Sequence, residues 1–128
     1  MIYIDSSVVL GELLMENRRP SPTLWDETLV ASRLLEYEVW NRLHARGLSA
    51  THGNSARLVL SQVTLYELSA DHLERALHPF PISIRTLDSL HLATTEYLRR
   101  RGRVITLASY DQRLLTAAAA LGIEPAPL

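Results

Sequence analysis

Three absences narrow the chemistry that this sequence can support. The chain contains no cysteine, which excludes thiol catalysis, thiolate zinc sites and disulfide bonds. It contains no lysine either, so its 13 basic residues other than histidine are all arginine, and both Schiff-base catalysis and Walker-type phosphate binding are excluded. No segment resembles a signal peptide or a membrane span, so we expect a cytoplasmic protein that makes no membrane contact.

Length and composition predict a single domain over residues 1–128. Hydrophobic residues make up 47% of the chain, which is enough for a core that needs no disulfide support. The formal net charge is −1, so the protein as a whole does not attract nucleic acid. Any contact with nucleic acid must therefore come from a local group of arginines.

Short apolar runs alternate with helical patterns along the whole chain, which predicts a parallel sheet with helices on both faces. A serine precedes several of the expected helices and is a suitable N-cap: Ser6 or Ser7, Ser32, Ser69 and Ser109. The expected strands are residues 2–4, 29–31, 63–68 and 104–108; the expected helices are residues 8–14, 33–46, 52–60, 70–77, 86–101 and 110–121; residues 123–125 are expected to be extended.

Four acidic residues occupy positions at strand ends or inside helices. Asp5 directly follows the first strand pattern, Asp111 follows the last one by a few residues, Asp88 falls in the first turn of a helix, and Glu38 lies about two turns into another. Ligands of open α/β sheets bind at the carboxyl ends of the strands. Carboxylates gathered there repel one another unless a cation neutralises them, and oxygen ligands favour Mg²⁺ or Mn²⁺.

Each of these residues also has an ordinary structural explanation. Asp88 and Asp111 suit the first turn of a helix, where a carboxylate meets the positive end of the helix dipole. Glu38 can pair with Arg42 one turn later, and its neighbour Glu36 is an alternative candidate. His91 shares a helix edge with Asp88, and we interpret it as a hydrogen-bonded packing residue that could also approach a metal or substrate.

Four segments together resemble the PIN-domain ribonucleases, and among them the VapC toxins of toxin–antitoxin pairs. They are MIYIDSSVVL at the start, VASRLLEYEVWNRL from Val30, RTLDSLHLATTEYL from Arg85 and VITLASYDQRLLTAA from Val104. In this family the acidic residue of the second segment stands six positions after the serine that ends the strand, which selects Glu38 over Glu36. The implied fold is a three-layer α/β/α PIN-like domain with a mainly parallel sheet of four to five strands.

The resemblance implies the toxin of a type II toxin–antitoxin system, a metal-dependent endoribonuclease. One or two Mg²⁺ or Mn²⁺ ions would activate the water that hydrolyses the RNA, and Ser6 and Ser109 would orient carboxylates as second-shell groups. The implied partners are a VapB-like antitoxin, the RNA substrate and a second copy of the chain in a homodimer. The catalytic and metal-binding residues would be Asp5, Glu38, Asp88 and Asp111, and the candidate RNA-binding residues Arg42, Arg46, Arg99, Arg100 and Arg101.

Other functions remain open at this point. Aspartyl-phosphate phosphatases and receiver domains also place an aspartate after a strand, but both use a lysine near the phosphate, which this chain lacks. The phosphatases also need a second aspartate two positions after the first, where this chain has Ser7. A PIN nuclease of RNA processing without an antitoxin, and an inactive PIN-like interaction domain, are the remaining alternatives.

Overall fold

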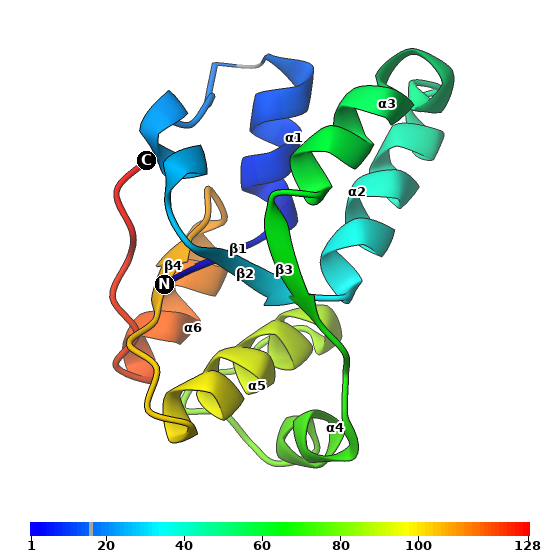
Figure 1. Ribbon diagram of the computed structural model, residues 1–128. Coiled ribbons are helices and arrows are strands. Elements are labelled where there is room, and N and C mark those ends of the chain that lie inside the picture. The colour runs from blue at the N-terminus through cyan, green and yellow to red at the C-terminus, as the bar shows by residue number, and fades with distance from the viewer. Residues whose placement is uncertain (16) are drawn as a thin grey trace.

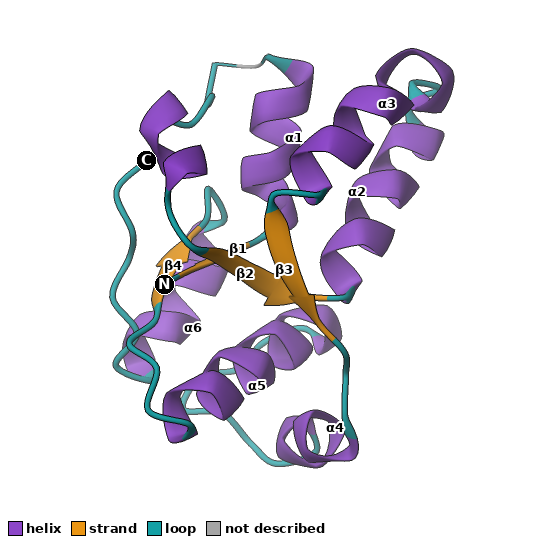
Figure 2. Cartoon of the chain, in the orientation of Figure 1, coloured by secondary structure: helices purple, strands orange, loops and turns teal. Residues whose placement is uncertain are grey.

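The computed structural model describes residues 1–15 and 17–128, which form four strands, six α-helices and one 3₁₀ helix (Figures 1 and 2). In chain order these are β1 (Ile2–Ile4), α1 (Ser6–Leu14), the 3₁₀ helix η1 (Pro22–Asp26), β2 (Leu29–Ser32), α2 (Leu34–Ala45), α3 (Ser49–Leu60), β3 (Val63–Tyr66), α4 (Ala70–Ala76), α5 (Thr86–Arg100), β4 (Thr106–Ala108) and α6 (Gln112–Ala120). Within this described part of the chain, no helix is long and apolar enough to cross a bilayer.

The strands form one parallel sheet in the order β3-β2-β1-β4. Ile2 of β1 pairs with Leu29 of β2 on one side and with Thr106 of β4 on the other. Beyond β4, Pro125 forms an isolated parallel bridge to Leu107, so the extended tail adds a further contact at that edge. The predicted parallel sheet of four to five strands is confirmed.

Helices cover both faces of the sheet, as the alternating pattern predicts. Figure 1 shows α1, α2 and α3 on one face and α4, α5 and α6 on the other. The chain moves outward from β1 through β2 to β3, and then crosses back to add β4 on the far side of β1. The strand order therefore reverses between β1 and β4, and ligand sites of such sheets lie outside the carboxyl ends of the strands at this reversal.

The central strands are buried on both faces, which explains why they appear in the sequence as continuous apolar runs. Tyr3 and Ile4 of β1 are fully buried, and all four residues of β2 are buried. Leu35, Val39 and Leu43 follow the helical spacing of α2 and pack into the same core. The segments that follow β1 and β4 therefore begin at residues held in the core.

Several element boundaries differ from the sequence prediction. β4 begins at Thr106, not at residue 104, and Val104 is 85% exposed. β3 ends at Tyr66, α3 begins at Ser49, three residues earlier than expected, and η1 was not predicted.

The helix caps differ as well. α1 and α6 are capped by Asp5 and Asp111, not by the neighbouring serines, because each aspartate side chain accepts a hydrogen bond from a backbone N–H of the first turn. Ser69 caps α4 as predicted, in a capping box with His72.

Candidate active site

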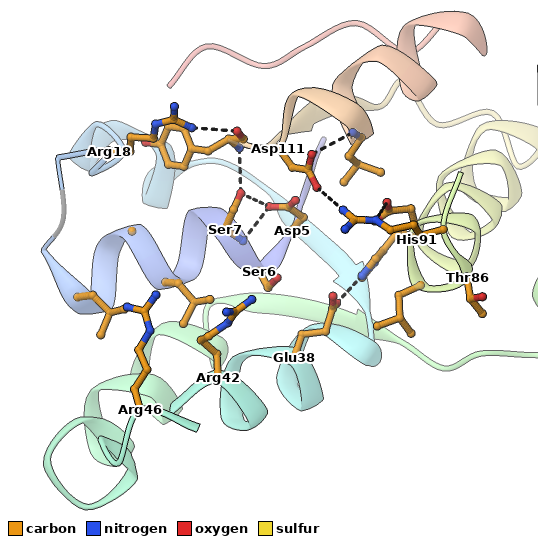
Figure 3. Close-up of a pocket in the computed structure, with 18 residues that line it drawn as sticks. Asp5, Ser6, Ser7, Arg18, Glu38, Arg42, Arg46, Thr86, His91 and Asp111 are labelled. Carbon is orange, nitrogen blue, oxygen red and sulfur yellow. Dashed lines mark hydrogen bonds and ion pairs between the residues drawn. The ribbon is translucent and has the colours of Figure 1, made fainter. Parts of the chain in front are cut away.

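A cleft of about 720 Å³ lies at the carboxyl ends of β1 and β4, where the strand order reverses (Figure 3). Its walls come from α1, α2, α5 and the segment between β4 and α6. The four acidic residues singled out in the sequence all line it: Asp5, Glu38, Asp88 and Asp111. The fold therefore brings together carboxylates from four separate segments of the chain.

Asp5 is the most enclosed of these acids, with 6% of its surface exposed. One carboxylate oxygen, Oδ1, accepts hydrogen bonds from the backbone N–H of Ser7 at 2.9 Å and from its hydroxyl at 2.6 Å, and Oδ2 accepts from the Ser109 hydroxyl at 2.7 Å. Burial raises the pKa of Asp5, and the hydrogen bonds from Ser7 and Ser109 lower it only in part. Ser109 contacts Asp5 as the sequence predicts; Ser6 lines the cleft, but the bonds from this helix turn come from Ser7.

Ser109 also connects Asp5 to Asp111. Its hydroxyl oxygen accepts a hydrogen bond from the backbone N–H of Asp111 at 2.9 Å while it donates to Asp5. Ser7 makes the equivalent link in the other direction, because its hydroxyl accepts from the backbone N–H of Tyr110 at 2.9 Å. The two serines thus fix the start of α1 against the start of α6, and with it the relative positions of two of the acids.

Asp88 and Asp111 share one cation, the guanidinium of Arg85. Arg85 Nε lies 3.5 Å from Asp88 Oδ2, and its Nη2 lies 3.3 Å from Asp111 Oδ2. The pKa of Asp88 is nonetheless raised, because burial and the nearby Asp111 outweigh the attraction of Arg85. Sequence reasoning missed Arg85, although its position three residues before Asp88 is the spacing of a helical ion pair.

Glu38 is held by His91, which is 2% exposed. His91 Nε2 and Glu38 Oε1 are hydrogen-bonded at 2.5 Å, and His91 Nδ1 is bonded to the hydroxyl of Tyr3 at 2.6 Å. The rival residue Glu36 pairs with Arg33 at 3.4 Å and is not among the residues that line the cleft, so the geometry favours Glu38. The interpretation of His91 as a hydrogen-bonded packing residue is confirmed, and its partner is one of the four acids.

The arginines predicted to bind RNA fall into two groups. Arg42 of α2 and Arg46, the residue after its end, line the cleft, and Arg18 lies opposite them, where it donates to the backbone oxygen of Tyr110 at 3.1 Å (Figure 3). Arg18 was not singled out in the sequence. The other group lies at the opposite end of α5, lining separate cavities: Arg99, Arg100 and Arg101.

The donor set fits a divalent cation in its chemistry. Four carboxylates line one cleft, and the raised pKa values of Asp5 and Asp88 indicate negative charge that the protein does not fully compensate. Among the described residues, no three acidic or histidine side chains already converge as a ligand set. One oxygen of Glu38 contacts His91 and one oxygen of Asp111 contacts Arg85.

Comparison with known proteins identifies relatives that match almost the whole chain. Residues 2–120 match the family model described as PIN domain. Ribonuclease VapC46 of Mycobacterium tuberculosis (strain ATCC 25618 / H37Rv) is 32% identical over 126 residues, covering 95% of this chain and 93% of the relative. Ribonuclease VapC35 of M. tuberculosis (strain CDC 1551 / Oshkosh) is 30% identical over 132 residues, covering 96% and 93%.

Two solved structures share the fold. M. tuberculosis VapC20, described as a sarcin-ricin loop cleaving toxin, superposes with a TM-score of 0.68 at 18% identity, and the match covers 100% of both chains. A chain of a toxin–antitoxin complex from Klebsiella pneumoniae superposes with a TM-score of 0.62 at 15% identity, over 94% of each chain. At these identities the likeness establishes the three-dimensional fold alone.

Proposed function

The chain belongs to the PIN-domain family, in which its homologues are VapC ribonucleases, and we propose that it is the toxin of a type II toxin–antitoxin system, an endoribonuclease that depends on Mg²⁺ or Mn²⁺. The observation that carries this proposal is the single cleft lined by four carboxylates at the strand-order reversal. Without thiol or lysine chemistry, hydrolysis by an activated water is the reaction that these side chains support.

Asp5, Glu38, Asp88 and Asp111 would hold one or two cations. When bound, such a cation supplies activation of water and neutralisation of the charge that develops on the phosphate. Ser7 and Ser109 already orient Asp5 for this role. Each serine hydroxyl donates a hydrogen bond to one of the two carboxylate oxygens, which keeps the carboxylate fixed. Glu38, Asp88 and Asp111 are held by His91 or Arg85, and must leave or share these partners when a cation enters.

The arginines of the cleft would position the RNA. Arg42 lies in the last turns of α2 and Arg46 is its C-cap residue, while Arg18 faces them from the other wall. Guanidinium groups bind phosphate through paired N–H donors, so this end of the cleft suits the phosphates that flank the cleaved bond. Tyr110 beside Arg18 offers an aromatic ring on which an unpaired base could stack.

Arg99, Arg100 and Arg101 would contact RNA only outside the cleft. They stand near the end of α5, whereas Asp88 is in its first turn, and 11 residues of helix separate Asp88 from Arg99 by about 16 Å. Arg99 donates to the backbone oxygen of Leu121 at 2.7 Å, and Arg100 pairs with Glu96 at 3.5 Å. We assign these arginines to a distal part of the substrate, away from the bond that is cut.

The proposed partners are a VapB-like antitoxin and a second copy of the chain. The structural likeness to a chain of a toxin–antitoxin complex supports the first. Expressed alone, the protein should arrest the growth of a bacterial host, and co-expression of the neighbouring antitoxin gene should relieve the arrest by forming a stable complex. Normal growth in the presence of abundant folded protein would favour a PIN nuclease of RNA processing instead.

The deciding experiment is cleavage of single-stranded RNA by the purified protein. We expect cleavage with Mg²⁺ or Mn²⁺ and none in excess EDTA, and we expect Asp5→Asn and Glu38→Gln to be inactive with either cation. Glu36→Gln is the matched control on the helix of Glu38 and should retain activity, since its side chain pairs with Arg33 outside the cleft. Cleavage that continues undiminished in the chelator would refute the proposal.

A further inference from the structure

A buried hydrogen-bond chain connects the sheet to Glu38. It starts at the backbone N–H of Ser32, which donates to the hydroxyl oxygen of Tyr3 at 2.9 Å. The Tyr3 hydroxyl is bonded to His91 Nδ1, and His91 Nε2 to Glu38 Oε1. Tyr3 and Ser32 are fully buried and His91 is 2% exposed, so water does not compete for the bonds among these three residues.

The Tyr3 hydroxyl joins the backbone of β2 to the imidazole of His91. A backbone N–H can only donate, so the oxygen of Tyr3 must accept from Ser32. The same hydroxyl lies at hydrogen-bond distance, 2.6 Å, from His91 Nδ1. Thr94 lies near the same hydroxyl, but it gives its own proton to the backbone oxygen of Leu90 at 2.9 Å.

The carboxylate of Glu38 dictates that Nε2 of His91 carries hydrogen. A carboxylate oxygen can only accept, so the contact with Oε1 needs an N–H on Nε2 of His91. A ring without that hydrogen would place a lone pair against the carboxylate. Oε1 of Glu38 is thereby occupied, and among the described residues Oε2 has no hydrogen-bond or ion-pair partner, which leaves it available to the cleft.

We propose that Tyr3 and His91 are positioning residues that hold Glu38 ready for a ligand, through a hydrogen bond that His91 Nε2–H donates to one of its carboxylate oxygens. Outer partners of this kind orient a metal-binding carboxylate without touching the metal themselves. The proposal rests on the proposed function in one respect, namely that Glu38 is a cation ligand. The hydrogen on His91 Nε2 does not depend on that function and can be measured on its own.

The first test is nitrogen NMR of the histidine rings in the metal-free protein near neutral pH. We expect His91, assigned by the loss of its signals in His91→Gln, to carry a hydrogen on Nε2. A His91 ring without hydrogen on Nε2 in the parent protein would overturn the proposal.

The second test is the affinity for Mn²⁺, measured by calorimetry with the metal alone. A glutamine amide can reproduce the Nε2–H donor of histidine, whereas an asparagine amide reaches only the position of Nδ1. We therefore expect His91→Gln to bind Mn²⁺ within about threefold of the parent, and His91→Asn and Tyr3→Phe to bind it about 10- to 100-fold more weakly.

The control separates positioning from a general loss of stability. Thr95→Ala removes another fully buried hydroxyl on α5, which donates to the backbone oxygen of Leu92 at 2.7 Å and has no link to Glu38. If Thr95→Ala weakens Mn²⁺ binding as much as Tyr3→Phe, or if His91→Asn binds as tightly as His91→Gln, the positioning role is refuted. A parent protein that binds no Mn²⁺ would instead refute the proposed function.

Discussion

Neutralising Asp88 should change the stability of the protein in opposite directions with and without a cation. The pKa of Asp88 is raised in the folded protein by burial and by Asp111, even with Arg85 beside it. A raised carboxyl pKa stabilises the fold at pH values below the ordinary pKa, and this contribution is lost as the pH rises through the folded pKa. At neutral pH the ionised carboxylate is therefore a cost, and Asp88→Asn should be at least as stable as the parent when no metal is present.

The opposing loss of the Arg85 ion pair is small. Arg85 is 65% exposed, and ion pairs three or four residues apart on a helix contribute about 0.2–0.5 kcal/mol. The raised pKa of Asp88 already includes the attraction of Arg85, so the net direction stands. The advantage of Asp88→Asn should shrink as the pH is lowered toward about 4, where the parent carboxyl also becomes neutral.

Saturating metal should reverse the order of the two proteins. At a hundredfold excess over its dissociation constant, a ligand stabilises the folded state by about 2.7 kcal/mol. With an unfolding entropy of about 2.1 cal/mol/K per residue, a chain of 128 residues has about 0.27 kcal/mol/K, so the parent should gain about 10 °C in melting temperature. If losing Asp88 weakens binding a hundredfold, the same Mn²⁺ concentration stabilises the variant by only about 0.4 kcal/mol, or about 1.5 °C.

The assay is a set of melting curves with and without Mn²⁺ for the parent, Asp88→Asn and the control Glu36→Gln, read beside RNA cleavage. The control should keep both the metal response and the activity, because Glu36 lies outside the cleft. An Asp88→Asn protein that shows the full gain with Mn²⁺, that still cuts RNA, or that melts below the parent without metal would refute the reasoning.

Three further changes test separate parts of the cleft. Ser109→Ala removes a buried hydrogen bond to a carboxylate and should lower the free energy of unfolding by about 1.5–3 kcal/mol in a denaturant titration. Arg42→Gln should raise KM for RNA and reduce the slope of log affinity against log salt by about 0.7, whereas the control Arg57→Gln, on α3 away from the cleft, should leave the slope unchanged. Arg85→Gln should lower the melting temperature without metal and tighten Mn²⁺ binding in calorimetry, because the cation no longer competes with the guanidinium for two aspartates; unchanged Mn²⁺ affinity would count against that competition.

The sequence predicts the scaffold well because the fold depends on patterns that are local. Strands buried on both faces appear as short apolar runs, and their alternation with helices determines a parallel sheet. Once the sheet is parallel, residues that follow its strands gather at one edge, which is why Asp5 and Asp111 could be placed together. The assignment of Glu38 required the family resemblance, because helical spacing alone did not distinguish Glu38 from Glu36.

The helix caps show where local reasoning stops. A serine and an aspartate near the start of a helix are comparable N-caps, so the sequence does not say which residue adopts the extended conformation that capping requires. In the structure Asp5 and Asp111 both adopt it, and the serines Ser7 and Ser109 instead bond to Asp5. The choice depends on contacts between segments that are about a hundred residues apart, which no local pattern encodes.

The distance of Arg99 from the cleft could be predicted from helix geometry, whereas the position of Arg18 could not. The length of α5 already separates Arg99 from Asp88 by about 16 Å, so the distance of this group from the cleft follows from the sequence once the helix is assigned. Arg18 is different, because it follows α1 in a segment without a regular pattern. Only the tertiary structure brings it to Tyr110 and the wall of the cleft.

The charge of the cleft connects these observations to how RNA could bind. Four carboxylates and four guanidinium groups line it, so the cleft is formally balanced although the two signs are partly separated within it. A balanced cleft in a protein of net charge −1 has no strong attraction for a polyanion. Each divalent cation held by the carboxylates would add two positive charges and would release Arg85 from its aspartates. If the proposed function is correct, the cation would also make the cleft attractive to RNA, and the arginines would act on the substrate only after the acids have been neutralised.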